Sequence, residues 1–447
     1  MTAPADRVPL PSLAAAVKAG RADATALLRA LIARQAEGEA AVMAAVAGHL
    51  AALGADIETL RYDPASVPLV DEFASAAAMT SGAREAIIAR FKGAGGGRSL
   101  LIFAHPDSEP VRGTEAWRHD PFAGIIDDGR LHGWGVADDL AGVAASISAL
   151  GAIRAAGLTL SGDVVVAITP SKRHARGIAA VLDHGVTADA ALYLHPAESG
   201  VGLAEIKAFA SGVLEFEITV PGALPETHEP SHTAFAHRAV NPVDKAVVLI
   251  EALHRLDEAR GGRVHHPRLE AAVGRSTNIL IAAIAGGNPA TPQRMASMLR
   301  ITGSVSFPPF ETIAAVQAEI EAAIAAATEA DTFLKSHKPE IRWLSGVSGS
   351  DVPDEHPLYR IAAEAISRVA GIATRVNPMH TSSDIRNPLV QKGIPAIGLG
   401  PLAGDLTHAG GHDEWVDIAD HCRAVTVAAL ITTSWCGITP SPAESAG

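Results

Sequence analysis

Short apolar runs that alternate with helical segments are the feature that most constrains the fold of this chain. Unbroken apolar runs occupy residues 99–104, 164–168 and 190–194, and apolar residues with helical spacing occupy 140–156 and 178–184. Runs of this length that are almost wholly apolar are typical of strands that are buried on both faces. Their alternation with helices predicts a largely parallel sheet with helices on its faces.

A different pattern in the middle of the chain predicts a second domain. This stretch combines strand-like and helical segments, over residues 214–220, 242–256, 277–284, 298–307 and 312–330. The order strand, helix, strand, strand, helix is typical of an α+β sandwich. We therefore expect an α/β fold in which a catalytic domain of residues 1–209 and 346–447 is interrupted by an inserted α+β domain of residues 210–345.

Charge and cysteine usage exclude several classes of protein. The 447 residues include 36 Lys and Arg against 49 Asp and Glu, which gives a formal net charge of −13. This charge repels phosphate backbones and anionic lipids, so we expect no nucleic-acid or membrane partner. The two cysteines, Cys422 and Cys436, are typical of a reducing compartment. Because we find neither a signal peptide nor an apolar run near the ~18 residues of a membrane span, we expect a cytoplasmic protein.

Three polar side chains follow predicted strands or begin a predicted helix, where functional groups of an α/β sheet collect. His105 and His195 come directly after two of the apolar runs, and Asp138 ends a glycine-bearing turn before a helix. Two imidazoles and one carboxylate suit a divalent transition metal with open positions. Asp107, two residues after His105, is placed to hold the other ring nitrogen of that histidine. The alternative is that each residue is structural, since the chain has 19 histidines and Asp138 has the position of a helix cap.

The order of these motifs resembles the metallopeptidase family of acetylornithine deacetylase, succinyl-diaminopimelate desuccinylase and carboxypeptidase G. Further matching segments follow in the family's order, at Gly38-Glu39, 232–242, 342–346, Ser383-Asp384, Gly400-Pro401 and His408. The desuccinylase branch is especially similar at residues 232–242 and 343–346. The resemblance covers nearly the whole chain.

The resemblance implies a dinuclear zinc enzyme whose inserted domain dimerises. By position, it places His105, the bridging carboxylate Asp138 and His195 at one metal, although the family has an acid where His195 stands. It places His408 at the other metal. It also implies that His232 polarises the substrate carbonyl across the dimer interface, the alternative being a solvated loop histidine.

The chain departs from the family where two adjacent glutamates are expected, a general base and a metal ligand. Residues 169–174 read TPSKRH and contain no acid. A metal that relied on the missing ligand would meet positive charge, so we expect one divalent metal per chain, Mn, Zn or Co, rather than two. The role of His408 is less defined, because six residues separate it from Glu414 where the family has four, and His412 competes.

Other residues are candidates for the missing base and for substrate contacts. His380 lies where the family has small residues near the site, so it is a candidate base or substrate contact, with a structural role as the alternative. Lys172, Arg173 and Arg386 are candidate partners of a substrate carboxylate. For Lys172 and Arg173 the alternative is an exposed basic loop. Asn241 belongs to the matched segment after His232 and is a further candidate substrate contact.

These residues predict a metal-dependent hydrolase that cleaves a C–N bond of a small carboxylate-bearing molecule. The candidate catalytic groups are Asp107, His232 and His380. The candidate reaction is hydrolytic deamination of an aromatic amine, of the type that converts 5-nitroanthranilate to 5-nitrosalicylate. An N-acyl-amino-acid deacylase or dipeptidase is the alternative within the family, and a non-catalytic binding paralogue is the alternative from another class. We expect a homodimer through the inserted domain, or a higher homo-oligomer.

Overall fold

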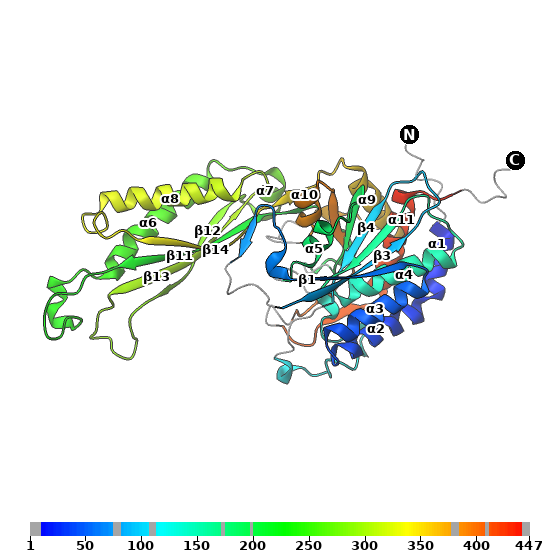
Figure 1. Cartoon of the computed structure of the whole chain (residues 1–447), viewed down its shortest axis with the longest axis horizontal. Coiled ribbons are helices and arrows are strands. Elements are labelled where there is room, and N and C mark those ends of the chain that lie inside the picture. Colours follow the sequence, from blue (N-terminus) through cyan, green and yellow to red (C-terminus); the bar gives the residue numbers. More distant parts are fainter. Residues whose placement is uncertain are drawn as a thin grey trace.

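The chain folds into two lobes, each built on its own sheet (Figure 1). The structure is a computed structural model. It describes residues 10–74, 82–106, 113–170, 175–196, 200–376, 384–406 and 411–439. The larger lobe contains both ends of the described chain, and the smaller lobe is formed mainly by its middle.

The larger lobe is built on a six-stranded sheet in the order β1-β3-β7-β4-β8-β17. Its strands are β1 Asp56–Tyr62, β3 Arg84–Phe91, β7 Val164–Ile168, β4 Leu100–Ala104, β8 Ala190–Leu194 and β17 Ala396–Leu399. The four strands from β7 to β17 are parallel, and β1 and β3 run antiparallel at one edge. Every residue of β4 and β8 is buried, as their unbroken apolar runs predict.

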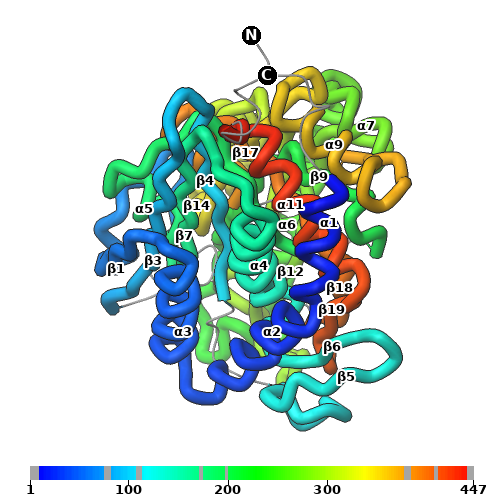
Figure 2. The backbone as a smooth tube through the Cα atoms, turned by 90° about the vertical axis from the view of Figure 1, so that its right-hand side faces the viewer, coloured from blue at the N-terminus to red at the C-terminus, as the bar shows by residue number. Residues whose placement is uncertain are grey.

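Helices cover both faces of this sheet. They are α1 Leu10–Ala19, α2 Arg21–Gln35, α3 Glu39–Ala52, α4 Ala141–Ala155, α5 Gly177–Asp183, α9 Pro357–Ala370, α10 Arg386–Lys392 and α11 Ile418–Cys436. In Figure 2, α4 lies in front of the central strands, with α1, α2 and α11 beside it. The segment Val136–Ala155 is long and apolar enough to cross a membrane, but 89% of its apolar window is buried, so it is a core helix of this lobe.

The smaller lobe is an antiparallel sheet with two long helices on one face (Figure 1). Its strands, in spatial order, are β12 Asn278–Ala285, β13 Met298–Phe307, β11 Gly212–Pro221, β14 Glu340–Val347 and β2 Glu72–Ala74. The helices are α6 Pro242–Gly261 and α8 Ile313–Ala330, and the short α7 Pro267–Val273 follows α6. Alternate residues of β11 are buried against the helices in a second hydrophobic core. The predicted α/β class with an inserted α+β domain is therefore confirmed, whereas the boundaries at 210 and 345 stay a prediction.

Strand β2 was not expected, because it comes from the first part of the chain and joins the sheet of the smaller lobe. It pairs with β14, where Gly346 lies opposite Phe73. A Cβ at Gly346 would lie 2.4 Å from the ring of Phe73, so the glycine makes room for that ring. The lobes are thus connected through β2 as well as through the two ends of the inserted segment.

Short strands complete the fold. They are β5 Ile125–Asp127, β6 Arg130–His132, β9 Glu205–Ile206, β10 Phe209–Ala210, β15 Ser350–Asp351, β16 Arg375–Val376, β18 Ala403–Gly404 and β19 Trp415–Asp417. Of these, β6 leads into the turn before α4, and β9 leads away from the carboxyl end of β8.

Candidate metal centre

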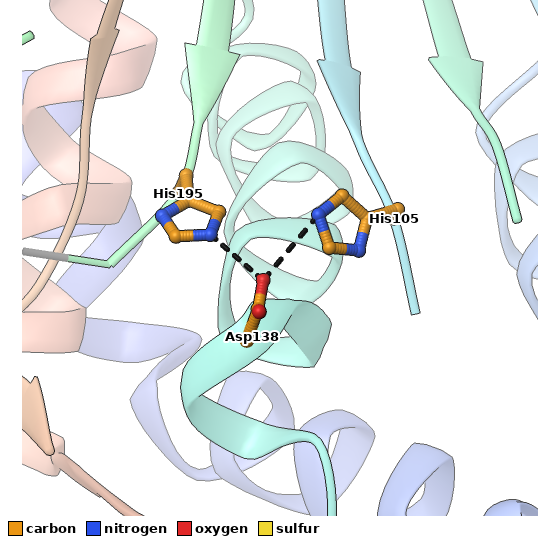
Figure 3. A group of neighbouring side chains, drawn as sticks. All are labelled: His105, Asp138 and His195. Carbon is orange, nitrogen blue, oxygen red and sulfur yellow. Dashed lines mark hydrogen bonds and ion pairs between the residues drawn. The ribbon is translucent and has the colours of Figure 1, made fainter. Parts of the chain in front are cut away.

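The predicted trio comes together at the carboxyl edge of the larger sheet. Figure 3 shows His105 and His195 descending from the ends of two strands toward Asp138, which lies at the start of a helix. Asp138 Oδ1 lies 2.8 Å from His195 Nε2 and 3.4 Å from His105 Nε2. The three side chains are almost fully buried, and one candidate ligand atom from each lies within 4.8 Å of the others.

Strand pairing and one close packing contact explain this convergence. Because β4 and β8 are adjacent and parallel, the residues that follow them meet at the same edge. The start of α4 then approaches the end of β8 very closely. A Cβ at Gly142 would lie 1.8 Å from the carbonyl oxygen of Leu194 and 2.3 Å from Asp139 Oδ1. Only glycine fits there, and this approach places Asp138 beside His195.

The donor set fits a divalent transition metal. Two imidazole nitrogens and a carboxylate oxygen are ligands that Zn²⁺, Mn²⁺ and Co²⁺ accept, and three protein ligands leave positions for water and substrate. The three side chains converge at the sheet edge, as Figure 3 shows, and all three are buried. In the described part of the chain this is the only such group of histidine, cysteine, aspartate and glutamate side chains.

Tyr193 is a member of the site that the sequence analysis missed. Its hydroxyl lies 2.9 Å from His105 Nε2, the same nitrogen that faces Asp138. Its ring stacks on Phe103, with centroids 4.7 Å apart and planes 6° apart, and the side chain is buried. The available signal was the strand period of two, which places Tyr193 on the same face as His195.

Lys207 and Asp139 are two further buried ionisable side chains beside the trio. Lys207 Nζ lies 2.6 Å from His195 Nδ1, and the lysine is buried. Burial raises the pKa of Asp139 well above its usual range and the charge of Asp138 adds to this, whereas Lys207 and backbone N–H groups oppose it. The backbone donors to Asp139 are Gly142 and His105, so this carboxyl also ties the helix start to the strand end.

Several predicted site residues lie outside the described residues. They are Asp107, Lys172, Arg173, His380 and His408. Their predicted roles, as helper of His105, as substrate contacts, as replacement base and as a further metal ligand, stay predictions.

His232 and Asn241 belong to the smaller lobe. His232 Nδ1 accepts a hydrogen bond from the backbone N–H of Ala234, and Asn241 Oδ1 accepts one from Val243 at the start of α6. Figure 1 places α6 in the smaller lobe, whereas β4 and β8, whose ends carry the histidines of the trio, belong to the larger one. His232 caps the short helix Thr233–Arg238 and Asn241 caps α6, both within the smaller lobe. Their predicted substrate contacts stay predictions.

Arg386 is buried between the lobes. Its guanidinium donates to the carboxylate of Glu72 at 2.9 Å, to the carbonyl oxygen of Val70 at 3.0 Å and to both oxygens of Ser348 at 2.8 Å. Burial lowers its pKa, and the charge of Glu72 opposes this. These contacts favour a structural role that fastens β2 to the larger lobe, so its predicted contact with a substrate carboxylate stays a prediction.

Comparisons with known proteins agree on one family. The model of Peptidase family M20/M25/M40 matches residues 101–434. A succinyl-diaminopimelate desuccinylase from Methylobacterium radiotolerans is 30% identical over 341 residues, which cover 74% of this chain and 79% of that protein. An N-formyl-4-amino-5-aminomethyl-2-methylpyrimidine deformylase from Halalkalibacterium halodurans is 24% identical over 354 residues, which cover 76% of this chain and 79% of that protein.

A solved structure shares the fold. The YXEP protein of Bacillus subtilis, a dinuclear metal binding peptidase, superposes with a TM-score of 0.58 at 16% identity. The match covers 94% of this chain and 99% of that chain.

Proposed function

Since this chain belongs to peptidase family M20/M25/M40, and is a hydrolase of that family, we propose that it removes a short acyl group from the nitrogen of a small carboxylate-bearing substrate. The observation that carries the proposal is the buried set of His105, Asp138 and His195 at the sheet edge. Two relatives support the amide bond as the target, because the names desuccinylase and deformylase denote removal of short acyl groups from those proteins' substrates.

The comparisons support some of the reactions expected from the sequence and give no support to others. The resemblance to the desuccinylase family is confirmed. The deacylase or dipeptidase alternative agrees with the relatives. Hydrolytic deamination of an aromatic amine has no support among them, so the amide reaction takes its place in the proposal.

The chain's own residues would hold one divalent cation. His105 and His195 would bind it through ring nitrogens, and Asp138 through its carboxylate. Such a cation polarises an amide carbonyl and lowers the pKa of water toward neutrality. We propose one metal per chain, because residues 169–174 contain no acid. Since the YXEP protein is dinuclear, elemental analysis that returns two tightly held ions per chain would contradict this count.

We propose a homodimer that forms through the smaller lobe. Strand β12 lies at the edge of its sheet, and its side chains Leu280 and Ile284 are more than half exposed. Val243 and Val247, one turn apart on α6, are about half exposed as well. An exposed apolar edge strand is a surface that pairs with another chain. In such a dimer, His232 would polarise the substrate carbonyl at the partner's site.

We also propose that the protein acts in the cytoplasm on small molecules. Both cysteines are free in the structure, with Cys436 buried and Cys422 half-buried. Free thiols are typical of a reducing compartment. The net charge of −13 opposes binding to nucleic acids and anionic membranes.

Product analysis with a substrate panel tests the proposed reaction. N-succinyl, N-formyl and N-acetyl amino acids, dipeptides and aminobenzoates are incubated with the protein and Mn²⁺, Co²⁺ or Zn²⁺. We expect release of an amine and a short carboxylic acid, and loss of this activity with a chelator. His105→Ala should abolish turnover, whereas His49→Ala, at an exposed position of α3, should not. Release of ammonia from an aminobenzoate would contradict the amide reaction, and no product from any compound would favour the binding paralogue.

A further inference from the structure

Tyr193 is a buried tyrosine whose hydroxyl the proposed reaction has not yet used. It lies on β8 two residues before His195. It pairs across the sheet with Phe103 of β4, which lies two residues before His105. Side chains two residues apart along a strand point to the same face. Two adjacent strands therefore each present an aromatic ring followed by a histidine of the trio.

The ring of Tyr193 is held beside both histidine rings. Its centroid lies 4.9 Å from that of His195 and 6.2 Å from that of His105. The ring also stacks on Phe103, with centroids 4.7 Å apart, and the residue is only 2% exposed. These contacts fix the ring, so the hydroxyl oxygen has a defined position in the site.

The hydroxyl oxygen contacts the ring nitrogen of His105 that faces the metal position. Tyr193 Oη lies 2.9 Å from His105 Nε2, and the same nitrogen lies 3.4 Å from Asp138 Oδ1. A group that only orients a histidine ligand contacts the ring nitrogen that does not bind the metal. Atoms that bind one ion at ~2.0–2.2 Å lie roughly 3 Å from each other. His105 Nε2 has this spacing to both oxygens.

We propose that Tyr193 Oη is a fourth protein ligand of the metal centre, in addition to the trio. The proposal rests on the proposed metal-dependent function. When the hydroxyl donates to His105 Nε2, this nitrogen has the electron pair that a metal ligand needs. On metal binding the hydroxyl loses its hydrogen to solvent, and Nε2 and Oη both face the ion.

The charges of the site favour a phenolate ligand. The trio contains a single carboxylate, and residues 169–174 contain no acid. Asp139, beside the trio, accepts hydrogen bonds from backbone N–H groups, and the amino group of Lys207 is buried nearby. A phenolate oxygen therefore supplies a second negative charge for a divalent cation. A further position stays open for water, because Zn²⁺ expands to five ligands and Mn²⁺ accepts six.

Metal affinity of Tyr193→Phe tests the proposal without substrate. Phenylalanine keeps the ring that stacks on Phe103 and removes only the hydroxyl. We expect the dissociation constant for Co²⁺, measured by calorimetry, to rise more than about tenfold, because loss of a group that merely orients a ligand already costs ~10–100-fold. Tyr359→Phe on α9 is the matched control, and its affinity should equal that of the unchanged protein.

The near-ultraviolet spectrum shows whether the hydroxyl itself becomes a ligand. The chain has three tyrosines, and burial raises the pKa of Tyr62 and that of Tyr359, so neither ionises at neutral pH. Titration with Zn²⁺ at neutral pH should therefore produce the absorption difference of one tyrosinate per chain, in step with metal binding. Tyr193→Phe should lose this difference, and Tyr359→Phe should keep it.

The two measurements separate a ligand from a helper. Weaker Co²⁺ binding by Tyr193→Phe, without a tyrosinate signal in the unchanged protein, would overturn the proposal, because the hydroxyl would then act only through His105. Equal Co²⁺ binding by Tyr193→Phe would also overturn it. Absence of metal binding by the unchanged protein would overturn the metal centre itself, and the proposal with it. A tyrosinate signal without product from any substrate would support the ligand and contradict the proposed reaction.

Discussion

At the scale of single residues, the site depends on contacts that side chains make with the two histidines. Asp138 contacts both histidines, the hydroxyl of Tyr193 contacts His105, and the amino group of Lys207 contacts His195. Buried polar groups of this kind are costly unless they are all hydrogen-bonded. Substitutions that remove one partner are therefore expected to lower turnover more than they lower the free energy of unfolding.

Tyr193→Phe should reduce turnover with little change in stability. The substitution removes the hydroxyl that contacts His105 Nε2 but keeps the ring stacked on Phe103. Loss of one hydrogen bond at the site corresponds to about a tenfold fall in kcat. Steady-state kinetics with the preferred substrate measure this, with Tyr359→Phe on α9 as the control. Equal kcat for Tyr193→Phe and the unchanged protein would contradict a role in the site.

His421 should make stability depend on pH. Its ring is buried and contacts the carbonyl oxygen of Ala141 at 3.1 Å, and burial lowers its pKa below the ordinary value of 6.5. Because the unfolded chain takes up this proton first, the free energy of unfolding falls as the pH falls below about 6.5. The slope contributed by His421 is about 1.4 kcal/mol per pH unit.

Urea unfolding of the metal-free protein at pH 8, 6.5 and 5.5 measures this slope. His421→Gln should show a shallower dependence than the unchanged protein over the acidic part of this range. At pH 8 the ring of His421 is neutral in the folded and in the unfolded chain, so the difference between the two proteins there is only the cost of the substitution. The same pH dependence of the free energy of unfolding in both proteins would contradict the prediction.

At the scale of elements, the packing of α4 against the end of β8 positions the aspartate of the trio. Gly142→Ala should destabilise the protein by about 1–3 kcal/mol and weaken Co²⁺ binding, because the added methyl group would overlap the carbonyl oxygen of Leu194. Gly151→Ala lies in the same helix, where the nearest atom would be 3.8 Å away, and should be neutral or stabilising. Urea unfolding and calorimetry compare the two variants. Equal effects of the two would contradict the packing argument.

Elements differ in how far the sequence predicts them. The strands β4 and β8 could be predicted because their apolar runs are long enough to be unambiguous, and the trio followed because parallel strands end at one edge. Strand β2 could not be predicted, since a strand of three residues is too short to show the alternation of buried and exposed side chains. In the sequence, Tyr193 looks like an ordinary core residue of an apolar strand. Lys207 follows a strand of only two residues, which is too short to predict. The roles of both depend on contacts that only the folded chain reveals.

At the scale of the whole molecule, assembly is expected to depend on the edge strand of the smaller lobe. Ile284→Glu on β12 should convert the proposed dimer into a monomer, because a buried unpaired charge at the interface is costly. Ile126→Glu on β5 of the larger lobe is the control, since the two isoleucines are 53% and 49% exposed. Sedimentation velocity measures the outcome. A monomeric unchanged protein, or dissociation by both variants, would contradict this interface.

The strand β2 has a consequence for engineering of the molecule. Recombination with a relative would ordinarily exchange the inserted segment as one cassette, cut at its two ends. Here such a graft would leave the host's β2 facing a foreign β14, with Phe73 matched to a position that must stay glycine. A working chimera therefore has to carry two pieces of chain from the donor, residues 72–74 and the segment from β11 to β14.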